Sequence, residues 1–117
     1  MPGPSSAWSS GSGAAAQEYT FTRRPFDGTL QDLASTVTID VLLHQRGARL
    51  GRSTPFGPCP GAAGVATFSV PGSRRLDEGF AVRDGAAIRT SYVRPAGAAE
   101  DPNVIDAMKN ALCAPPA

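Results

Sequence analysis

The sequence carries little charge of either sign, which limits the partners that it can attract. Charged residues are 18% of its 117 residues, and the formal net charge at pH 7 is +1. No strong field therefore draws the protein towards nucleic acid or an anionic membrane. Its apolar runs are only a few residues long, so we expect no transmembrane helix. The chain has 13 glycines and 11 prolines, which makes it loop-rich without being disordered by composition alone.

Lysine is nearly absent, since Lys109 is the only one beside ten arginines. The arginines are scattered, at Arg23, Arg24, Arg46, Arg49, Arg52, Arg74, Arg75, Arg83, Arg89 and Arg94. We expect them to be solvated surface charge. Because aromatic and basic residues do not interleave on a strand, nothing indicates binding of single-stranded nucleic acid.

The first sixteen residues lack charge and consist almost entirely of Ser, Gly, Pro and Ala around Trp8. Such a segment buries too little apolar surface to offset its ordering entropy, so residues 1–16 are predicted to be a disordered tail or linker. Ala14 to Ala16 resemble the small-residue end of a signal peptide, but the basic and apolar regions of a signal are missing. The tail is therefore a signal remnant, an added segment, or a linker from a membrane or lipid anchor.

Residue patterns predict one strand and one helix in the first half. Tyr19, Phe21 and Arg23 alternate with threonines, which predicts a strand over 18–24. A helix is predicted over 29–46, because Thr29 is a good N-cap and no glycine or proline interrupts the segment before Gly47. The alternative is a short helix followed by a strand over 36–43, where β-branched residues alternate.

Residue patterns in the second half of the sequence predict strands over 48–54, 65–70, 76–82 and 86–94, and a helix over 101–113. Asp84-Gly85 is a strong signal for a hairpin turn. Asp101 and Pro102 are typical of a helix start. The helix has one apolar face, formed by Val104, Ile105, Met108 and Leu112. We expect this face to pack on the sheet face that carries Phe68, Phe80 or Val82, and Ile88 or Tyr92.

This order of elements predicts an α+β fold. Residues 17–114 would form a single domain in which an N-terminal and a C-terminal helix pack on an antiparallel β-meander, as in an α-β-α sandwich. A chain of this length suits one modest hydrophobic core.

The chain has only two cysteines, Cys59 and Cys113. They form no CxxC motif and have no neighbouring histidine, which argues against a metal site or a nucleophilic thiol. A disulfide between them would link a Pro/Gly-rich loop to the last helix. We predict this disulfide rather than two separate buried thiols, and with it an oxidising compartment. We therefore predict a periplasmic or secreted protein, which the tail could also anchor.

No catalytic constellation stands out, and no cofactor is predicted. His44 is the only histidine, and Asp40 lies four residues before it on the predicted helix, so the two share a face. Asp77 and Glu78 are neighbours on a strand and would point to opposite faces, so they cannot act as a pair. The glycine-rich segment 61–64 lacks the spacing of a phosphate loop, which excludes a nucleotide site of that kind.

Phe56 is the candidate binding residue, because it is a large apolar group in the loop that carries Cys59. The structural interpretation is that the side chain of Phe56 packs beneath this loop. The functional interpretation is an exposed aromatic contact for a partner, held in place by the disulfide.

The segment from Phe80 to Pro95, followed by the terminal helix, resembles the PsbP/Mog1-like group of α-β-α sandwiches. In that group a hairpin whose last strand ends at a proline precedes a final helix, and the order of elements is compatible over residues 18–113. The cysteine pair and the short first half depart from the group. Its members include bacterial secreted proteins and lipoproteins, photosystem accessory proteins and a Ran-binding nuclear factor. The resemblance implies a binding module without catalysis, but it transfers no site residue.

Two functions follow as hypotheses. The first is a non-catalytic secreted or periplasmic binding or accessory module, whose partner is a protein or a cell-envelope component. The second is a small hydrolase or ligand-binding enzyme centred on His44 and Asp40.

Overall fold

The computed structural model describes residues 5–10 and 16–113. They form β1 (Ser5–Ser10), β2 (Gln17–Pro25), α1 (Leu30–His44), β3 (Arg49–Pro55), β4 (Ala63–Val70), β5 (Arg74–Arg83), β6 (Ala86–Pro95) and α2 (Pro102–Cys113). Every element that the sequence predicts after residue 16 is present, and its bounds agree within two residues.

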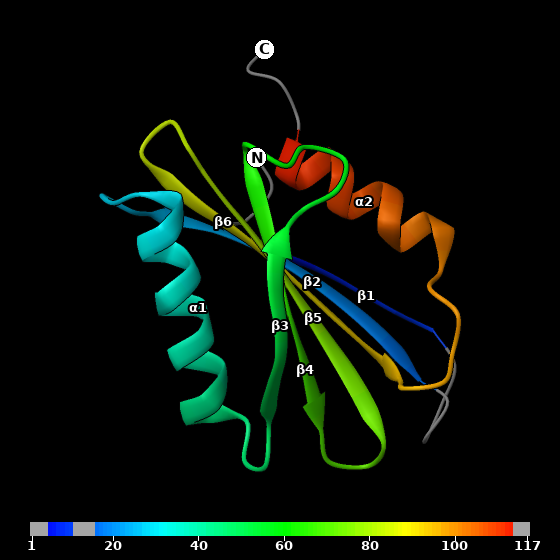
Figure 1. Ribbon diagram of the computed structural model, residues 1–117. Coiled ribbons are helices and arrows are strands. Elements are labelled where there is room, and N and C mark those ends of the chain that lie inside the picture. Colours follow the sequence, from blue (N-terminus) through cyan, green and yellow to red (C-terminus); the bar gives the residue numbers. More distant parts are fainter. Residues whose placement is uncertain (1–4, 11–15, 114–117) are drawn as a thin grey trace.

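The six strands form one antiparallel sheet in the order β1-β2-β6-β5-β4-β3. Strands β3 to β6 form a meander, and β2 joins it at β6. Helix α1 lies on one side of the sheet and α2 on the other (Figure 1). The fold is thus α+β in three layers, as predicted. Among the residues that the structure describes, no helix is long and apolar enough to cross a membrane.

Helix α1 begins at a capping box. The side chain of Thr29 accepts a hydrogen bond from the Asp32 N–H, and the Asp32 carboxylate accepts one from the Thr29 N–H at 2.9 Å. The bond from the Thr29 backbone holds the pKa of Asp32 below its ordinary value. Leu33, Val37 and Val41 recur every four residues and are buried. The alternative strand over 36–43 is not formed.

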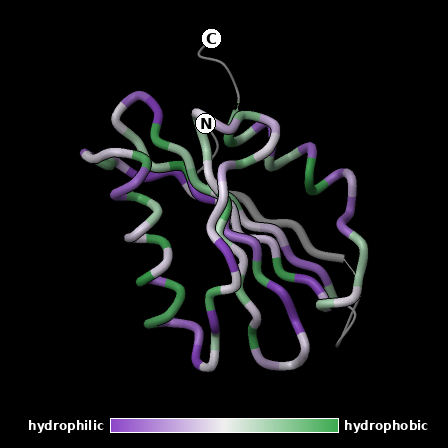
Figure 2. Tube along the Cα trace, in the orientation of Figure 1, coloured by the Kyte–Doolittle hydropathy of each residue, from purple (hydrophilic) through white to green (hydrophobic). Residues whose placement is uncertain are grey.

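Each helix covers its own hydrophobic core, and apolar residues recur along the strands between them (Figure 2). The core under α1 contains Leu33, Val37, Val41, Ala66, Phe68, Leu76, Phe80 and Ala87. The core under α2 contains Tyr19, Phe56, Ala63, Ala81, Ile88, Tyr92, Val104, Met108 and Leu112. The buried apolar residues of α2 are thus Val104, Met108 and Leu112, while Ile105 lies at the margin.

The prediction about the α2 face is half right. Ile88 and Tyr92 pack with α2, but Phe68 and Phe80 lie on the opposite face, under α1. The reason is the two-residue turn between β5 and β6, which places Ala81 opposite Ile88. Directly opposed residues share a face, so the neighbouring Phe80 points the other way.

The prediction of a disordered tail over 1–16 is wrong at Ser5–Ser10, which form the edge strand β1. This strand pairs antiparallel with β2, from Ser5 opposite Thr22 to Ser10 opposite Gln17. Backbone hydrogen bonds to an open sheet edge do not depend on hydrophobic composition, so composition alone missed them. The rest of the predicted tail, residues 1–4 and 11–15, lies outside the described residues.

Met108→Asp tests the packing of α2. Met108 is 2% exposed in the core under α2, so an unpaired carboxylate there should cost about 4 kcal/mol or more and leave the domain largely unfolded. Asn110→Asp, at an exposed position of the same helix, should change the free energy of unfolding by less than about 0.5 kcal/mol. Circular dichroism during urea denaturation measures both. Equal stability of the two variants would show that α2 does not pack through Met108.

Candidate functional site

A cavity lined by charged and polar side chains lies on the α1 side of the sheet, beside the C-terminal half of α1 and over β2, β5 and β6. Its volume is about 280 Å³. The polar residues that line it are Glu18, Thr20, Asp40, His44, Gln45, Glu78, Arg89 and Ser91. Pairing across the sheet explains part of this set, because Thr20 lies opposite Ser91 and Ser91 lies opposite Glu78. Three adjacent strands therefore present one row of polar side chains to the cavity.

Hydrogen bonds join five of these residues into one chain. The hydroxyl of Ser91 donates to Glu78, and Arg89 Nη2 donates to the other Glu78 oxygen at 2.9 Å. Arg89 Nη1 donates to Asp40 Oδ2 at 3.0 Å. Asp40 Oδ1 lies 2.9 Å from His44 Nδ1. The carboxylates of Glu78 and Asp40 therefore alternate with the nitrogen groups of Arg89 and His44 along the cavity wall.

Glu78 is the buried end of this chain, with only 2% of its surface exposed. Burial raises the pKa of its carboxyl, although the hydrogen bonds from Ser91 and Arg89 act in the opposite direction. The same carboxylate raises the pKa of Arg89 against the effect of that residue's own burial. The guanidinium of Arg89 is thus held as a cation between two acids.

His44 is the exposed end of the chain. Its Nδ1 lies 2.9 Å from both the backbone oxygen and a carboxylate oxygen of Asp40. Both atoms are acceptors, so Nδ1 carries a proton. In the neutral imidazole, Nε2 is then the acceptor nitrogen on a side chain that is 72% exposed.

The structure confirms that Asp40 and His44 share a face of α1, and it adds three residues that the sequence analysis did not connect with them. Arg89, Glu78 and Ser91 come from the central strands, 34 or more positions away in the chain. One of these contacts could have been predicted from the sequence. A two-residue turn at Asp84-Gly85 fixes the pairing of β5 with β6 and thereby places Glu78 opposite Ser91. The position of α1 over these strands has no such local signal.

Asp77 and Glu78 point to opposite faces, as the strand pattern predicts. On the α2 side, Asp77 accepts hydrogen bonds from Arg94 Nη1 at 2.6 Å and from Arg75 Nε at 3.0 Å. Arg94 is buried and also lies over the ring of Tyr92, 5.1 Å from its centroid. Each side of the sheet therefore holds its own buried carboxylate, neutralised by arginine.

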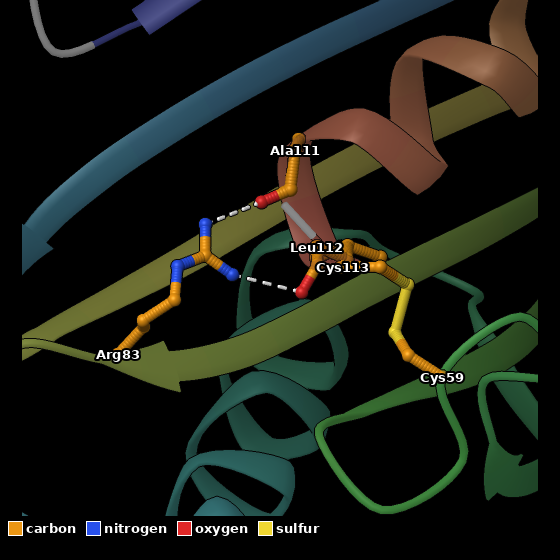
Figure 3. The surroundings of a disulfide bond; sticks show 5 residues. All are labelled: Cys59, Arg83, Ala111, Leu112 and Cys113. Atoms are coloured by element: carbon orange, nitrogen blue, oxygen red, sulfur yellow. Dashed lines mark hydrogen bonds between the residues drawn. A yellow bond between two sulfur atoms is a disulfide. The ribbon is translucent and has the colours of Figure 1, made fainter. Parts of the chain in front are cut away.

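The predicted disulfide between Cys59 and Cys113 is present, with 5.7 Å between the two Cα atoms. It joins the β3–β4 loop to the last residue of α2 (Figure 3). Beside it, Arg83 donates hydrogen bonds to the backbone oxygens of Leu112 at 2.9 Å and Ala111 at 2.8 Å. A cation there also suits the negative end of the helix dipole. The end of α2 is thus fixed by a covalent bond and by a charged side chain.

The prediction that Phe56 is an exposed binding residue is wrong. Phe56 is 7% exposed and belongs to the core under α2. Its N–H donates to the backbone oxygen of Ala63, and its own oxygen accepts from the N–H of Cys59. These bonds close the loop, so the aromatic ring packs beneath it, which is the alternative that the sequence left open.

Metal binding has no support in the described part of the chain, where no group of three or more His, Cys, Asp or Glu side chains could hold an ion. The cavity therefore offers hydrogen-bond donors and acceptors of mixed charge. It suits the recognition of a polar ligand group.

Comparisons with known proteins inform the fold alone. No protein-family model matches the chain, and no curated protein matches it. The chain is similar to the crystal structure of PA94 from Pseudomonas aeruginosa, a protein of unknown function, with a TM-score of 0.63 and 15% identity. The similarity covers 95% of this chain and 78% of that one. At this identity it supports the α+β architecture and says nothing about activity.

The disulfide closes a long loop, because its cysteines are 54 positions apart. In the chain-entropy model such a crosslink contributes about 4 kcal/mol. Cys59→Ser/Cys113→Ser should therefore lower the free energy of unfolding by about this amount, and reduction of the wild type should do the same. Urea denaturation with and without reductant measures the change. A reductant effect in the wild type that is no larger than in the double variant would contradict the crosslink.

Titration of Glu78 should make stability depend on pH. Folding raises the pKa of this carboxyl above its ordinary value of 4.5, so its contribution to stability is complete below that pH and is lost as the pH rises through the folded-state pKa. Relative to Glu78→Gln, the wild type should therefore become less stable as the pH increases from about 4 to about 8.

Chemical denaturation across this pH range measures the difference between the two proteins. Glu18→Gln removes an exposed carboxyl from the same cavity and is the matched control. A difference between wild type and Glu78→Gln that stays constant with pH, or that changes with the opposite sign, would contradict the assignment.

Proposed function

We propose that the protein is a non-catalytic binding module that holds a polar group of its partner in the cavity beside Asp40 and Arg89. The supporting observation is the position of Arg89, which two carboxylates hold from either side while 24% of its side chain stays exposed. An arginine that is already oriented loses little conformational entropy when it binds a ligand.

The cavity suits a ligand that has both donors and acceptors. Arg89 uses two of its five N–H donors on Glu78 and Asp40, so the guanidinium has further donors for a carbonyl oxygen. Asp40 and Glu18 offer acceptors for an N–H group. The amide groups of a polypeptide or of a peptide-bearing cell-envelope component combine these properties. This is the class of partner that we propose.

The compartment is part of the same proposal. The Cys59–Cys113 disulfide supports a periplasmic or secreted location, because structural disulfides persist in oxidising environments. A place in the PsbP/Mog1-like group is also proposed, on the strength of the resemblance of residues 80–113 and the three-layer fold.

A small hydrolase is the second candidate, and the contact between Asp40 and His44 favours it. The carboxylate orients the imidazole and leaves Nε2 towards solvent, as a general base requires. The nearby hydroxyl of Ser91 donates instead to Glu78. A catalytic role would therefore require His44 to activate water on its own.

Blocking the cavity tests the binding proposal. Acetylated dipeptide amides, added to ¹⁵N-labelled protein, should shift the amide resonances of Thr20, Asp40 and Ser91 in a saturable way. Thr20→Tyr places a ring at the cavity and should abolish these shifts. Ser53→Tyr makes the same kind of change at an exposed position of the edge strand β3, outside the cavity lining, and should retain them.

The same proteins separate the two candidate functions. Hydrolysis of p-nitrophenyl acetate above the buffer rate, lost in His44→Ala and kept in Ser53→Tyr, would support the hydrolase. Dipeptide amides that cause no saturable shifts at these three residues would contradict the binding proposal.

A further inference from the structure

Three arginines that are scattered in the sequence meet on the sheet face opposite the cavity. Arg49 lies opposite Ser69 and Arg52 lies opposite Thr67 in the pairing of β3 with β4. On the other side of β4, Ser69 lies opposite Arg75. Directly opposed residues share a face, so Arg49, Arg52 and Arg75 surround the two hydroxyl side chains of β4. We call these five residues the arginine surface.

A β-bulge makes this arrangement possible. Arg49 and Arg52 are three positions apart, and in a regular strand they would point to opposite faces. The register shifts between Leu50 and Arg52, so Gly51 is an extra residue and both arginines point to the same face. A Cβ at Gly51 would lie 3.3 Å from the backbone oxygen of Thr67, which explains glycine at the bulge.

The arginine surface is on the α2 side of the sheet but is not covered by α2. Thr67 also lies opposite Asp77, and Asp77 lies opposite Tyr92 in the core under α2, which identifies the face. Helix α2 packs on β5 and β6, whereas the arginines of β3 are exposed. A shallow cavity of about 270 Å³ is lined by Arg49, Arg75 and both β4 hydroxyl residues.

The formal net charge of +1 conceals a local excess of positive charge here. Among the residues that the structure describes, the ion pairs of this region are both made by Asp77, which is shared by Arg94 and Arg75. Arg75 reaches Asp77 through Nε, which leaves its two Nη groups for another acceptor. Within residues 16–113, Arg49 and Arg52 form no ion pair. Three guanidinium groups thus face solvent with little compensation.

We propose that the arginine surface binds a phosphate group. Arginine presents a planar fork of donors that matches phosphate oxygens, and the hydroxyls of Thr67 and Ser69 add donors between the forks. Arg49 and Arg75 are separated by one strand, so their backbones lie about 10 Å apart and their long side chains can converge over Ser69. The phosphate can belong to a lipid headgroup or to a soluble phosphate ester, and the experiment distinguishes these sources.

The experiment uses two probes at constant ionic strength. Inorganic phosphate is titrated into the labelled protein while the amide resonances of Thr67 and Ser69 are followed. Sedimentation with vesicles of phosphatidylcholine and phosphatidylglycerol, compared with phosphatidylcholine alone, measures lipid binding. Arg49→Gln/Arg52→Gln should weaken binding about tenfold or more, because two of the three forks are lost.

Two controls separate a defined site from general attraction of anions. Arg23→Gln/Arg24→Gln removes the same charge from exposed positions of β2 and should leave affinity within about twofold. Arg52→Gln/Ser53→Arg keeps the net charge of the wild type but moves one guanidinium to the α1 side, since Ser53 lies opposite Ala66. This variant should bind as weakly as Arg52→Gln alone.

The outcomes are distinct. Binding of free phosphate that follows this pattern supports the site and a soluble ester as its source. Binding to phosphatidylglycerol vesicles with the same pattern, without binding of free phosphate, supports the site and a lipid headgroup. No saturable binding of either probe, or an equal loss in both double arginine variants, would overturn the proposal. The peptide-amide shifts of the cavity are measured separately, so either proposal can fail alone.

Discussion

A two-residue turn at Asp84 and Gly85 sets the pairing of β5 with β6, and this pairing assigns each side chain of the two central strands to a face. Both turn residues have positive φ, 54° and 72°, as a type I′ turn requires. A slip of one residue would exchange the two faces. The buried acids would then lose their arginine partners, and Ile88 and Tyr92 would leave the core under α2.

Both faces of the sheet bury a carboxylate beside an arginine, but the two pairs differ in their access to solvent. Each buries a carboxylate against arginine, an arrangement whose desolvation cost is met only when both partners are present and well oriented. The Asp77–Arg94 pair is buried, with both residues 4% exposed. The Glu78–Arg89 pair continues through Asp40 to solvent at His44. The first arrangement stabilises the packing of the sheet, whereas the second leaves charged groups within reach of a ligand.

Close approach of α2 to the sheet depends on a residue without a side chain. A Cβ at Gly79 would lie 2.5 Å from Thr90 Oγ1 and 2.6 Å from a methyl carbon of Leu112. The helix therefore packs directly over the centre of β5, and its last residue reaches Cys59. The disulfide and the hydrogen bonds from Arg83 then hold this end, which restricts α2 to β5 and β6 and leaves the neighbouring β3–β4 surface open.

The sequence by itself determined the order and nearly all bounds of the elements after residue 16, because capping residues, turn residues and hydrophobic periodicity act over a few positions. It also indicated the disulfide and the shared face of Asp40 and His44. It missed β1, whose pairing is by backbone, and it assigned Phe56 and Phe80 to the wrong surroundings. Only the tertiary structure brought Arg89, Glu78 and Ser91 to Asp40, and Arg49, Arg52 and Arg75 together. These contacts depend on strand register, a bulge and the placement of a helix over the sheet, which join residues distant in the chain.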